Sequence, residues 1–234
     1  MRDRLLAGET LPRALAEQVV ELDLARSRIL DLRPLTVLTG LQRLVLTQTM
    51  VSDLTPIAAL TGLRRLELTR SRIEDLAPLA GLVQLHSLHL SYTAVSDLRP
   101  LVRLTRLTGL FLTGTLVQDV TPLAGLAALE RLDLGGVAIS DATALAGLRR
   151  LRSLDLSGTG VTDLRPLSGM GGLQYLALTG APVRDLSPLA GLTELRRLDL
   201  RGCGDIDISP LAALPRCQIV TRFLVARRRS APSN

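Results

Sequence analysis

Two histidines and the acids in neighbouring repeats are the first residues whose types suggest chemistry. His86 and His89 stand three residues apart, and on a strand this spacing points the two rings to opposite faces, so they form no metal pair. Glu67 or Asp133 beside His89 could make an acid/base couple, but no nucleophile or oxyanion site accompanies it. The sequence therefore predicts no catalytic residue, no metal site, no cofactor and no enzymatic activity.

The two cysteines are not expected to form a disulfide with each other. Cys203 is expected to follow one strand and Cys217 to start the next coil, which places them near opposite ends of the predicted sheet. A disulfide requires Cα atoms within ~7 Å of each other. We therefore predict two buried free thiols, which are typical of a reducing compartment.

Composition and charge narrow the class of protein. The 234 residues include 55 Leu and no Lys, and 47% are hydrophobic, which excludes a disordered chain. The net charge is +6, but residues 215–234 hold five Arg and no acid, so residues 1–214 carry 23 Arg against 22 acids. Residues 1–214 are nearly neutral and therefore lack the basic face that phosphate binding requires. Any contact with nucleic acid is expected to involve the basic residues 215–234.

No segment of the sequence predicts membrane insertion or export. Charges interrupt every apolar run before the ~18 residues that a membrane helix needs. Residues 1–8 contain too short an apolar run for the core of a signal peptide. The expected location is the cytoplasm, with no membrane partner, although a route of secretion without a signal would leave no trace here.

An exact 22-residue period organises the chain. When each repeat is numbered from its first residue, positions 4 and 6 are Leu in nine repeats, position 13 is Asp in nine, and position 16 is Pro in eight, with Ala144 the exception. The first position is Leu in eight repeats, and Val19 and Cys217 continue the series at its ends: Leu41, Leu63, Leu85, Leu107, Leu129, Leu151, Leu173 and Leu195.

Each position of the repeat has a structural reason. Alternation over positions 3 to 7 predicts a strand of a parallel sheet, with positions 4 and 6 inside and positions 3, 5 and 7 facing solvent. Glycine at position 8 of five repeats permits the positive φ of a tight turn. The Asp at position 13 is expected to cap a short helical turn that the Pro at position 16 fits, and positions 14, 17 and 20 complete the core.

This pattern resembles the leucine-rich repeat family, whose unit begins L-x-x-L-x-L-x-x-N/C-x-L. The segment 63–82 shows it, and its D-L-x-P-L-x-x-L half is similar to the subclass of internalins and of a phosphatase-regulatory subunit. The resemblance implies an α/β fold: a right-handed solenoid or horseshoe with a concave parallel β-sheet and short 3-10 or helical turns on the convex side. Together with an Arg-, Ala- and Gly-rich composition, it indicates a bacterial chain.

The repeats also set the domain boundaries. We expect an N-terminal helical cap over residues 1–18, nine repeats over 19–216, a C-terminal cap strand over 217–226 and a disordered basic tail over 227–234. Position 9 holds a hydroxyl in six repeats where the family has Asn, which predicts a thinner hydrogen-bonded ladder between coils. Val137 and Ala181 would interrupt that ladder, so residues 129–192 should open most easily.

The rare aromatic residues give the candidate binding site. Tyr92, Phe111 and Tyr175 fall on exposed positions of the repeat and not in the Leu core, and Tyr and Arg are enriched among the hot spots of protein interfaces. The alternative is that these rings only pack across strands. The predicted partner-binding residues are Arg65, Glu67, Arg70, His89, Tyr92, Phe111, Asp133 and Tyr175.

The function that follows is noncatalytic recognition of another protein, of unknown identity, through the concave face. A second hypothesis follows from the family resemblance: a sensing or autoinhibitory arm for a signalling ATPase or a translocated bacterial effector. An adaptor would bind one client, whereas a sensor arm would change the rate of an enzymatic partner.

Overall fold

The structure is a computed structural model that describes residues 12–214 and 216–221 of the chain. It contains a short helix, α2 (Arg13–Ala16), and one parallel sheet whose strands each have three residues. The strands are β1 (Glu21–Asp23), β2 (Arg43–Val45), β3 (Arg65–Glu67), β4 (Ser87–His89), β5 (Gly109–Phe111), β6 (Arg131–Asp133), β7 (Ser153–Asp155), β8 (Tyr175–Ala177), β9 (Arg197–Asp199) and β10 (Gln218–Val220).

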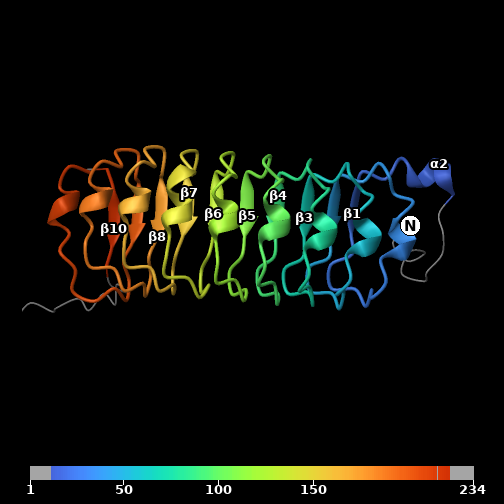
Figure 1. Cartoon of the computed structure of the whole chain (residues 1–234), viewed down its shortest axis with the longest axis horizontal. Coiled ribbons are helices and arrows are strands. Elements are labelled where there is room, and N and C mark those ends of the chain that lie inside the picture. Colours follow the sequence, from blue (N-terminus) through green and yellow to red (C-terminus); the bar gives the residue numbers. More distant parts are fainter. Residues whose placement is uncertain (1–11, 215, 222–234) are drawn as a thin grey trace, which may run out of the picture.

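A 3-10 helix follows each strand from β1 to β9 on the convex side of the coil. These helices are η1 (Arg33–Leu35), η2 (Thr55–Ile57), η3 (Ala77–Leu79), η4 (Arg99–Leu101), η5 (Thr121–Leu123), η6 (Thr143–Gly147), η7 (Arg165–Leu167), η8 (Ser187–Leu189) and η9 (Ser209–Leu211). One strand, one turn and one 3-10 helix make a coil, and Figure 1 shows the coils stacked along the long axis from β1 beside α2 to β10. The predicted leucine-rich-repeat solenoid is confirmed.

Strand order follows chain order, and the register repeats from coil to coil. Residues 22 apart are paired from β1 to β9, as in Leu44 with Leu66 and Leu110 with Leu132. The last pair differs, because Gln218 lies opposite Arg197, only 21 residues away. The coil between β9 and β10 is therefore one residue shorter than the 22-residue period, and Ile219 takes the inward place opposite Leu198.

The core is a stack of leucine layers. Leu110 and Leu112 of the strand segment and Leu123 and Leu126 of the convex turn have no exposed surface, and the equivalent residues of the other central coils are buried in the same way. Burying such a side chain stabilises the fold by about 1.5–3 kcal/mol. Each coil covers the apolar edge of its neighbour, so the stability belongs to the stack.

Aspartate at position 13 binds the start of the 3-10 helix in all nine repeats, from the position just before the N-cap residue. Its Oδ1 accepts the backbone N–H two residues later at 2.7–2.9 Å, as in Asp53 with Thr55 and Asp119 with Thr121. Proline lies in the first turn of eight of these helices. The exception, η6, has Ala144 in that place and extends to Gly147.

The hydroxyls at position 9 do not form the predicted ladder between coils. Thr49 Oγ1 donates to the Leu46 carbonyl of its own coil at 2.7 Å, and Ser71, Thr93, Thr115 and Thr159 do the same three residues back. The side chains are too short to reach past their own turn. Cys203 differs, because its Sγ donates to the carbonyl of Leu178 in the preceding coil at 3.0 Å, where Ala181 offers no hydroxyl.

Position 8 takes a left-handed backbone in every coil from β1 to β9. Glycine supplies it in the last five coils, with φ between 63° and 74° at Gly114, Gly136, Gly158, Gly180 and Gly202. The first four coils have φ of 58° at residues with side chains: Arg26, Gln48, Arg70 and Tyr92. A left-handed backbone costs an L-residue roughly 1–2 kcal/mol, so the N-terminal half of the solenoid holds strain that the C-terminal half does not.

The described residues include only part of each predicted cap. The helix α2 lies within residues 1–18, the span of the predicted N-terminal cap, and Ala16 and Val19 are buried against the first coil while Leu15 is 44% exposed. Residues 1–11 of the predicted N-terminal cap lie outside the described residues, as do 222–226 of the C-terminal cap and the predicted tail 227–234.

The aspartate cap yields a test of local stability. Asp119→Ala removes the acceptor of the Thr121 N–H, whereas Asp119→Asn keeps an acceptor and removes only the charge. We expect the denaturant midpoint to fall for the alanine variant and to change less for the asparagine variant. Equal midpoints for wild type and Asp119→Ala would contradict the capping role.

Candidate interaction site

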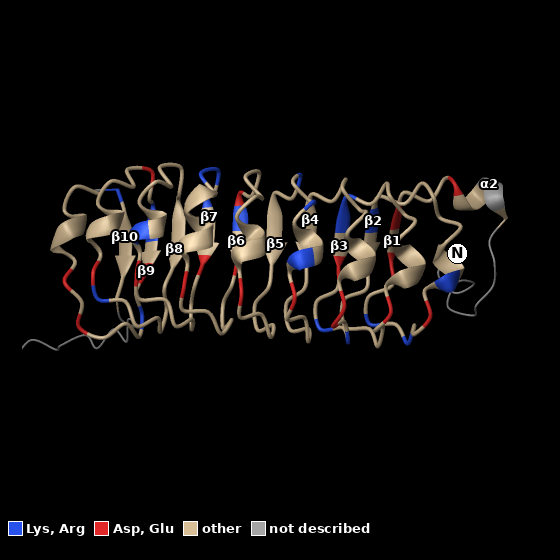
Figure 2. Cartoon of the chain, in the orientation of Figure 1, with Lys and Arg blue, Asp and Glu red and all other residues tan. Residues whose placement is uncertain are grey.

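The outward face of the sheet carries the side chains of positions 3 and 5 of each coil, and we call it the concave face. Four of the predicted residues lie together on it: Arg65 and Glu67 of β3, His89 of β4 and Phe111 of β5. Parallel register places Glu67 opposite His89 and His89 opposite Phe111 on adjacent strands. This group occupies the N-terminal half of the sheet. Figure 2 shows charged residues on β1, β2 and β3 and no charged residue on β5.

His89 and Phe111 form a stacked pair at the centre of this group. Their ring centroids are 4.2 Å apart with an interplanar angle of 19°. Ser87 Oγ shares a hydrogen bond with His89 Nε2 at 2.9 Å. Glycine at position 109 makes room for the second ring, because a Cβ there would lie 3.2 Å from Phe111 Cε2. The pair borders a hollow of about 190 Å³ whose other lining residues include Arg65, Thr108 and Arg131.

An ion-pair chain holds the charged residues beside the rings. Glu67 Oε1 accepts from Arg65 Nε at 2.8 Å and from the guanidinium of Arg43 at 3.1 Å, and Arg43 also lies 3.4 Å from Glu21. The Glu67 side chain is only 17% exposed, whereas those of Arg65 and Arg43 are 46% and 38% exposed. Two guanidinium groups are therefore fixed at the surface by one shielded carboxylate.

Burial among these groups changes the protonation of His89. Desolvation lowers the pKa of its imidazole from 6.5, Glu67 opposes this by attraction, and Arg65 adds to it by repulsion. The ring is therefore neutral at pH 7, which suits stacking on Phe111.

Arg70 and Tyr92 make a second pair away from the concave face. Both occupy position 8, at the edge of the solenoid where the strands end, and the Arg70 guanidinium carbon lies 5.2 Å from the centroid of the Tyr92 ring. Tyr92 is 53% exposed and its ring covers Gly114, where a Cβ would lie 2.8 Å from Tyr92 Cδ1. The sequence grouped these two residues with Phe111, and the structure places them on a different surface.

Of the last two predicted residues, Asp133 lies beside the His89–Phe111 pair and Tyr175 lies apart from it. Asp133 is next to Phe111 in the sheet, but its Oδ1 accepts the Gly135 N–H at 3.0 Å, so its carboxylate also closes the turn after β6. Tyr175 stands on β8, three strands from β5. Three strand spacings are about 14 Å, so Tyr175 does not contact the His89–Phe111 pair.

Asp199 is a charged residue of the sheet that sequence reasoning missed. Although position 5 was expected to face solvent, Asp199 is 1% exposed and binds Arg201 through both carboxylate oxygens at 2.6–3.0 Å. Thr179 Oγ1 donates to it at 3.1 Å, and the Arg201 bonds lower the pKa of the carboxyl. The signal in the sequence was Arg at position 7, where the other repeats have a small residue.

The remaining groups with possible chemistry are separate from one another. Within the described residues, no three His, Cys, Asp or Glu are grouped so that they could hold a metal ion. Cys203 and Cys217 are both free, as predicted, although Cys217 is only half-buried. A larger hollow of about 570 Å³ lies at the opposite edge, where the strands begin, and its lining mixes acids and Arg residues that include Arg149 and Arg150.

Known structures share this architecture. No family model and no curated protein matches the sequence. An internalin, InlF, of Listeria monocytogenes superposes with a TM-score of 0.79 at 26% identity, covering 94% of this chain and 73% of its own. Internalin C2 of the same organism gives 0.77 at 27% identity, with 83% and 88% covered.

A plant structure extends the likeness beyond bacteria. The leucine-rich-repeat ectodomain of a membrane receptor kinase from Arabidopsis thaliana gives a TM-score of 0.72 at 18% identity, covering 91% of this chain and 31% of its own. That ectodomain is in complex with Casparian strip integrity factor 2. In the described part of the present chain, no helix is long and apolar enough to span a membrane.

The pKa of His89 can be checked by NMR titration. We expect a value below 6.5 in the wild type and a rise toward 6.5 in Phe111→Leu, because burial is the largest cause of the shift. Since the folded pKa is lowered, the stability linked to it is present above about pH 6.5 and is lost as the pH falls through the folded value. Tyr175→Leu, three strands away, is the control that should leave the titration unchanged.

The packing of the Tyr92 ring against Gly114 gives a second test. Gly114→Ala and Gly180→Ala both place an L-residue at positive φ, at a cost of roughly 1–2 kcal/mol. Only at Gly114 does the added Cβ meet a ring, since nothing lies within 4 Å of a Cβ at Gly180. Chemical denaturation should show the larger loss for Gly114→Ala, and Tyr92→Ala in the same chain should remove the excess. Equal losses of stability in the two variants would contradict the close packing of Tyr92 against Gly114.

Proposed function

Because the chain is a leucine-rich-repeat protein, we propose that it is a noncatalytic recognition module that binds a partner protein on its concave face. The observation that carries this proposal is the stacked His89–Phe111 pair beside the hollow, with Arg65 and Arg131 around it. Partly exposed aromatic rings with arginines nearby are the usual anchors of protein interfaces. The plant ectodomain, bound to its factor, supports recognition as a use of this fold.

Preorganisation supports binding at this place. The ring stack, the Ser87 hydrogen bond and the Glu67 ion pairs fix the side chains before a partner arrives. Fixing a rotamer-rich side chain during binding costs about 0.5–1.5 kcal/mol, so groups that are already fixed favour affinity. The low pKa of His89 also keeps the centre of the patch uncharged at pH 7.

The dimensions of the sheet limit what the concave face can bind alone. Ten strands of three residues make a strip of roughly 43 Å by 10 Å, or about 430 Å². A stable interface buries about 800 Å² on each partner. The partner that we propose therefore reaches beyond the strands onto an edge of the solenoid.

A cytoplasmic location is part of the same proposal. Cys203 and Cys217 are free thiols, and a reducing compartment would keep them so. Burial raises the pKa of both thiols, which lowers their reactivity at neutral pH.

The test is an affinity capture from the native lysate with matched variants. Phe111→Asp places a charge in the anchor. The control is Val102→Asp, which introduces the same charge at a residue of the convex side that is 48% exposed. We expect one stoichiometric partner with wild type and Val102→Asp, and loss of at least tenfold with Phe111→Asp at an unchanged unfolding midpoint. A partner retained by Phe111→Asp would contradict concave-face binding.

A further inference from the structure

The edge where the strands end carries a second surface in the first four coils. It consists of Arg26, Arg28, Met50, Arg70, Arg72 and Tyr92, at positions 8 and 10 of the repeat, and we call it the arginine–tyrosine edge. We propose that this edge binds an extended acidic segment of a partner protein. The inference goes beyond the concave face, because it concerns a separate surface and a ligand of defined chemistry.

Backbone strain is the first argument. Position 8 needs a left-handed residue in every coil, and glycine meets that need in the last five coils, yet Arg26, Arg70 and Tyr92 occupy it in the first half. Their side chains add nothing to the core, because all three are exposed. Strain of this kind persists where a side chain is needed for function.

Unpaired positive charge is the second argument. No described carboxylate lies within ion-pair distance of the four arginines of this edge, Arg26, Arg28, Arg70 and Arg72. Elsewhere on the same coils, Arg33 and Arg99 bind the aspartates two residues before them. The charge of the edge is therefore available to a carboxylate from outside.

Neighbouring side chains hold two of these guanidinium groups in place. Arg26 Nε donates to Gln48 Oε1 in the next coil at 2.9 Å, and the Arg70 guanidinium lies over the Tyr92 ring. Each contact leaves part of the guanidinium fork open to a ligand. Met50, 42% exposed, and Tyr92, 53% exposed, add apolar surface between and beside the arginines.

The spacing of the edge matches an extended chain. The hydrogen bonds from Arg26 N to Thr47 O and from Gln48 N to Thr69 O continue the sheet to this position, at 2.9 and 2.8 Å. Successive coils are then about 4.8 Å apart, so Arg26 and Arg70 are separated by about 10 Å. Three residues of an extended peptide in the polyproline II conformation rise about 9.3 Å and return the side chain to the same face, so acids at every third position would meet successive arginines.

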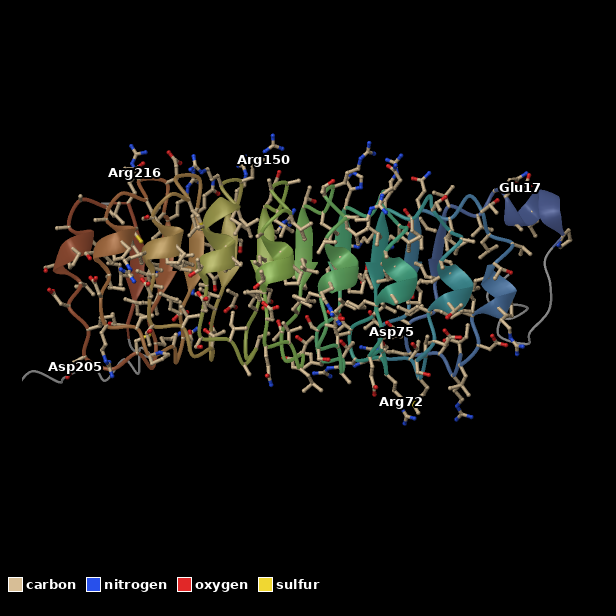
Figure 3. The ribbon with its side chains drawn as sticks, viewed as in Figure 1. Glu17, Arg72, Asp75, Arg150, Asp205 and Arg216 are labelled. Carbon is tan, nitrogen blue, oxygen red and sulfur yellow. The ribbon has the colours of Figure 1, made fainter. Side chains whose placement is uncertain are left out.

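The surroundings of the edge favour a peptide over a nucleic acid. The aspartates of position 13, such as Asp31, Asp53 and Asp75, line the same side of the coils, and Figure 2 shows red segments among the blue ones there. A continuous polyanion would be repelled by that column, whereas separate carboxylates can sit between. Figure 3 shows Arg72 pointing away from the body on this edge, opposite the edge of Arg150.

The test uses variants that remove charge and strain together. In Arg26→Gly/Arg70→Gly, glycine is the residue that later coils already use at this position. The control Arg149→Gly/Arg150→Gly makes the same charge change at the opposite edge, where Gly171 and Gly172 occupy the equivalent positions of the next repeat. The probe is a fluorescent peptide with Glu at every third position and a central Leu, and a peptide with the same residues but all Glu at one end is the comparison.

We expect fluorescence anisotropy to show binding to the wild type, the opposite-edge control and Phe111→Asp, and about tenfold weaker binding to Arg26→Gly/Arg70→Gly. That variant should unfold at a denaturant concentration no lower than the wild type, so weaker binding cannot be attributed to misfolding. Equal binding by both double variants would overturn the proposal, as would equal affinity for the two peptides. Tighter binding of a single-stranded oligonucleotide than of the peptide would also overturn it. Loss of partner capture by Phe111→Asp is a separate result that leaves this inference intact.

Discussion

Hydrogen bonding between consecutive coils is the constraint on which the rest of this structure depends. Each three-residue strand has too few bonds to exist alone, and it is held because the next coil presents the same backbone groups 22 residues later. A one-residue slip in the pairing of a strand would move each of its side chains between the inside and the surface. The leucine layers, the aspartate caps and the left-handed residue after each strand are consequences of keeping that register.

Most of the fold could be predicted because its determinants repeat. Leucine at positions 4 and 6 and aspartate at position 13 act through local geometry that is the same in nine coils, so the sequence alone predicted both the sheet and the caps. The exceptions arise where geometry is not local. Whether Thr49 reaches the next coil depends on the length of its side chain. The 21-residue spacing of the last pair of strands depends on the register in which Gln218 pairs with Arg197.

The candidate site was predicted less completely, for a related reason. Residue type and position placed Phe111 and His89 on one face and Tyr92 in the turn after its strand, but the sequence alone did not show that the turn carries its side chains away from the rings of the sheet. Tyr92 therefore belongs to the edge with Arg70 and not to the ring stack. The burial of Asp199 depends on its hydrogen bonds to the guanidinium of Arg201; the Arg at position 7 sets this repeat apart in the sequence, but the geometry of the bonds comes only from the structure.

The seat of the Tyr92 ring on Gly114 also limits how such an array can grow. A solenoid with an exact period could lengthen by duplicating a coil, since each new unit inherits the register of the old one. Duplicating the coil of Tyr92 would put a second tyrosine where the first requires a glycine, with a Cβ 2.8 Å from the ring. The coil of Gly180 carries no such demand. The order of the coils is thus constrained by contacts between side chains of neighbouring coils, even though all coils share the same backbone register.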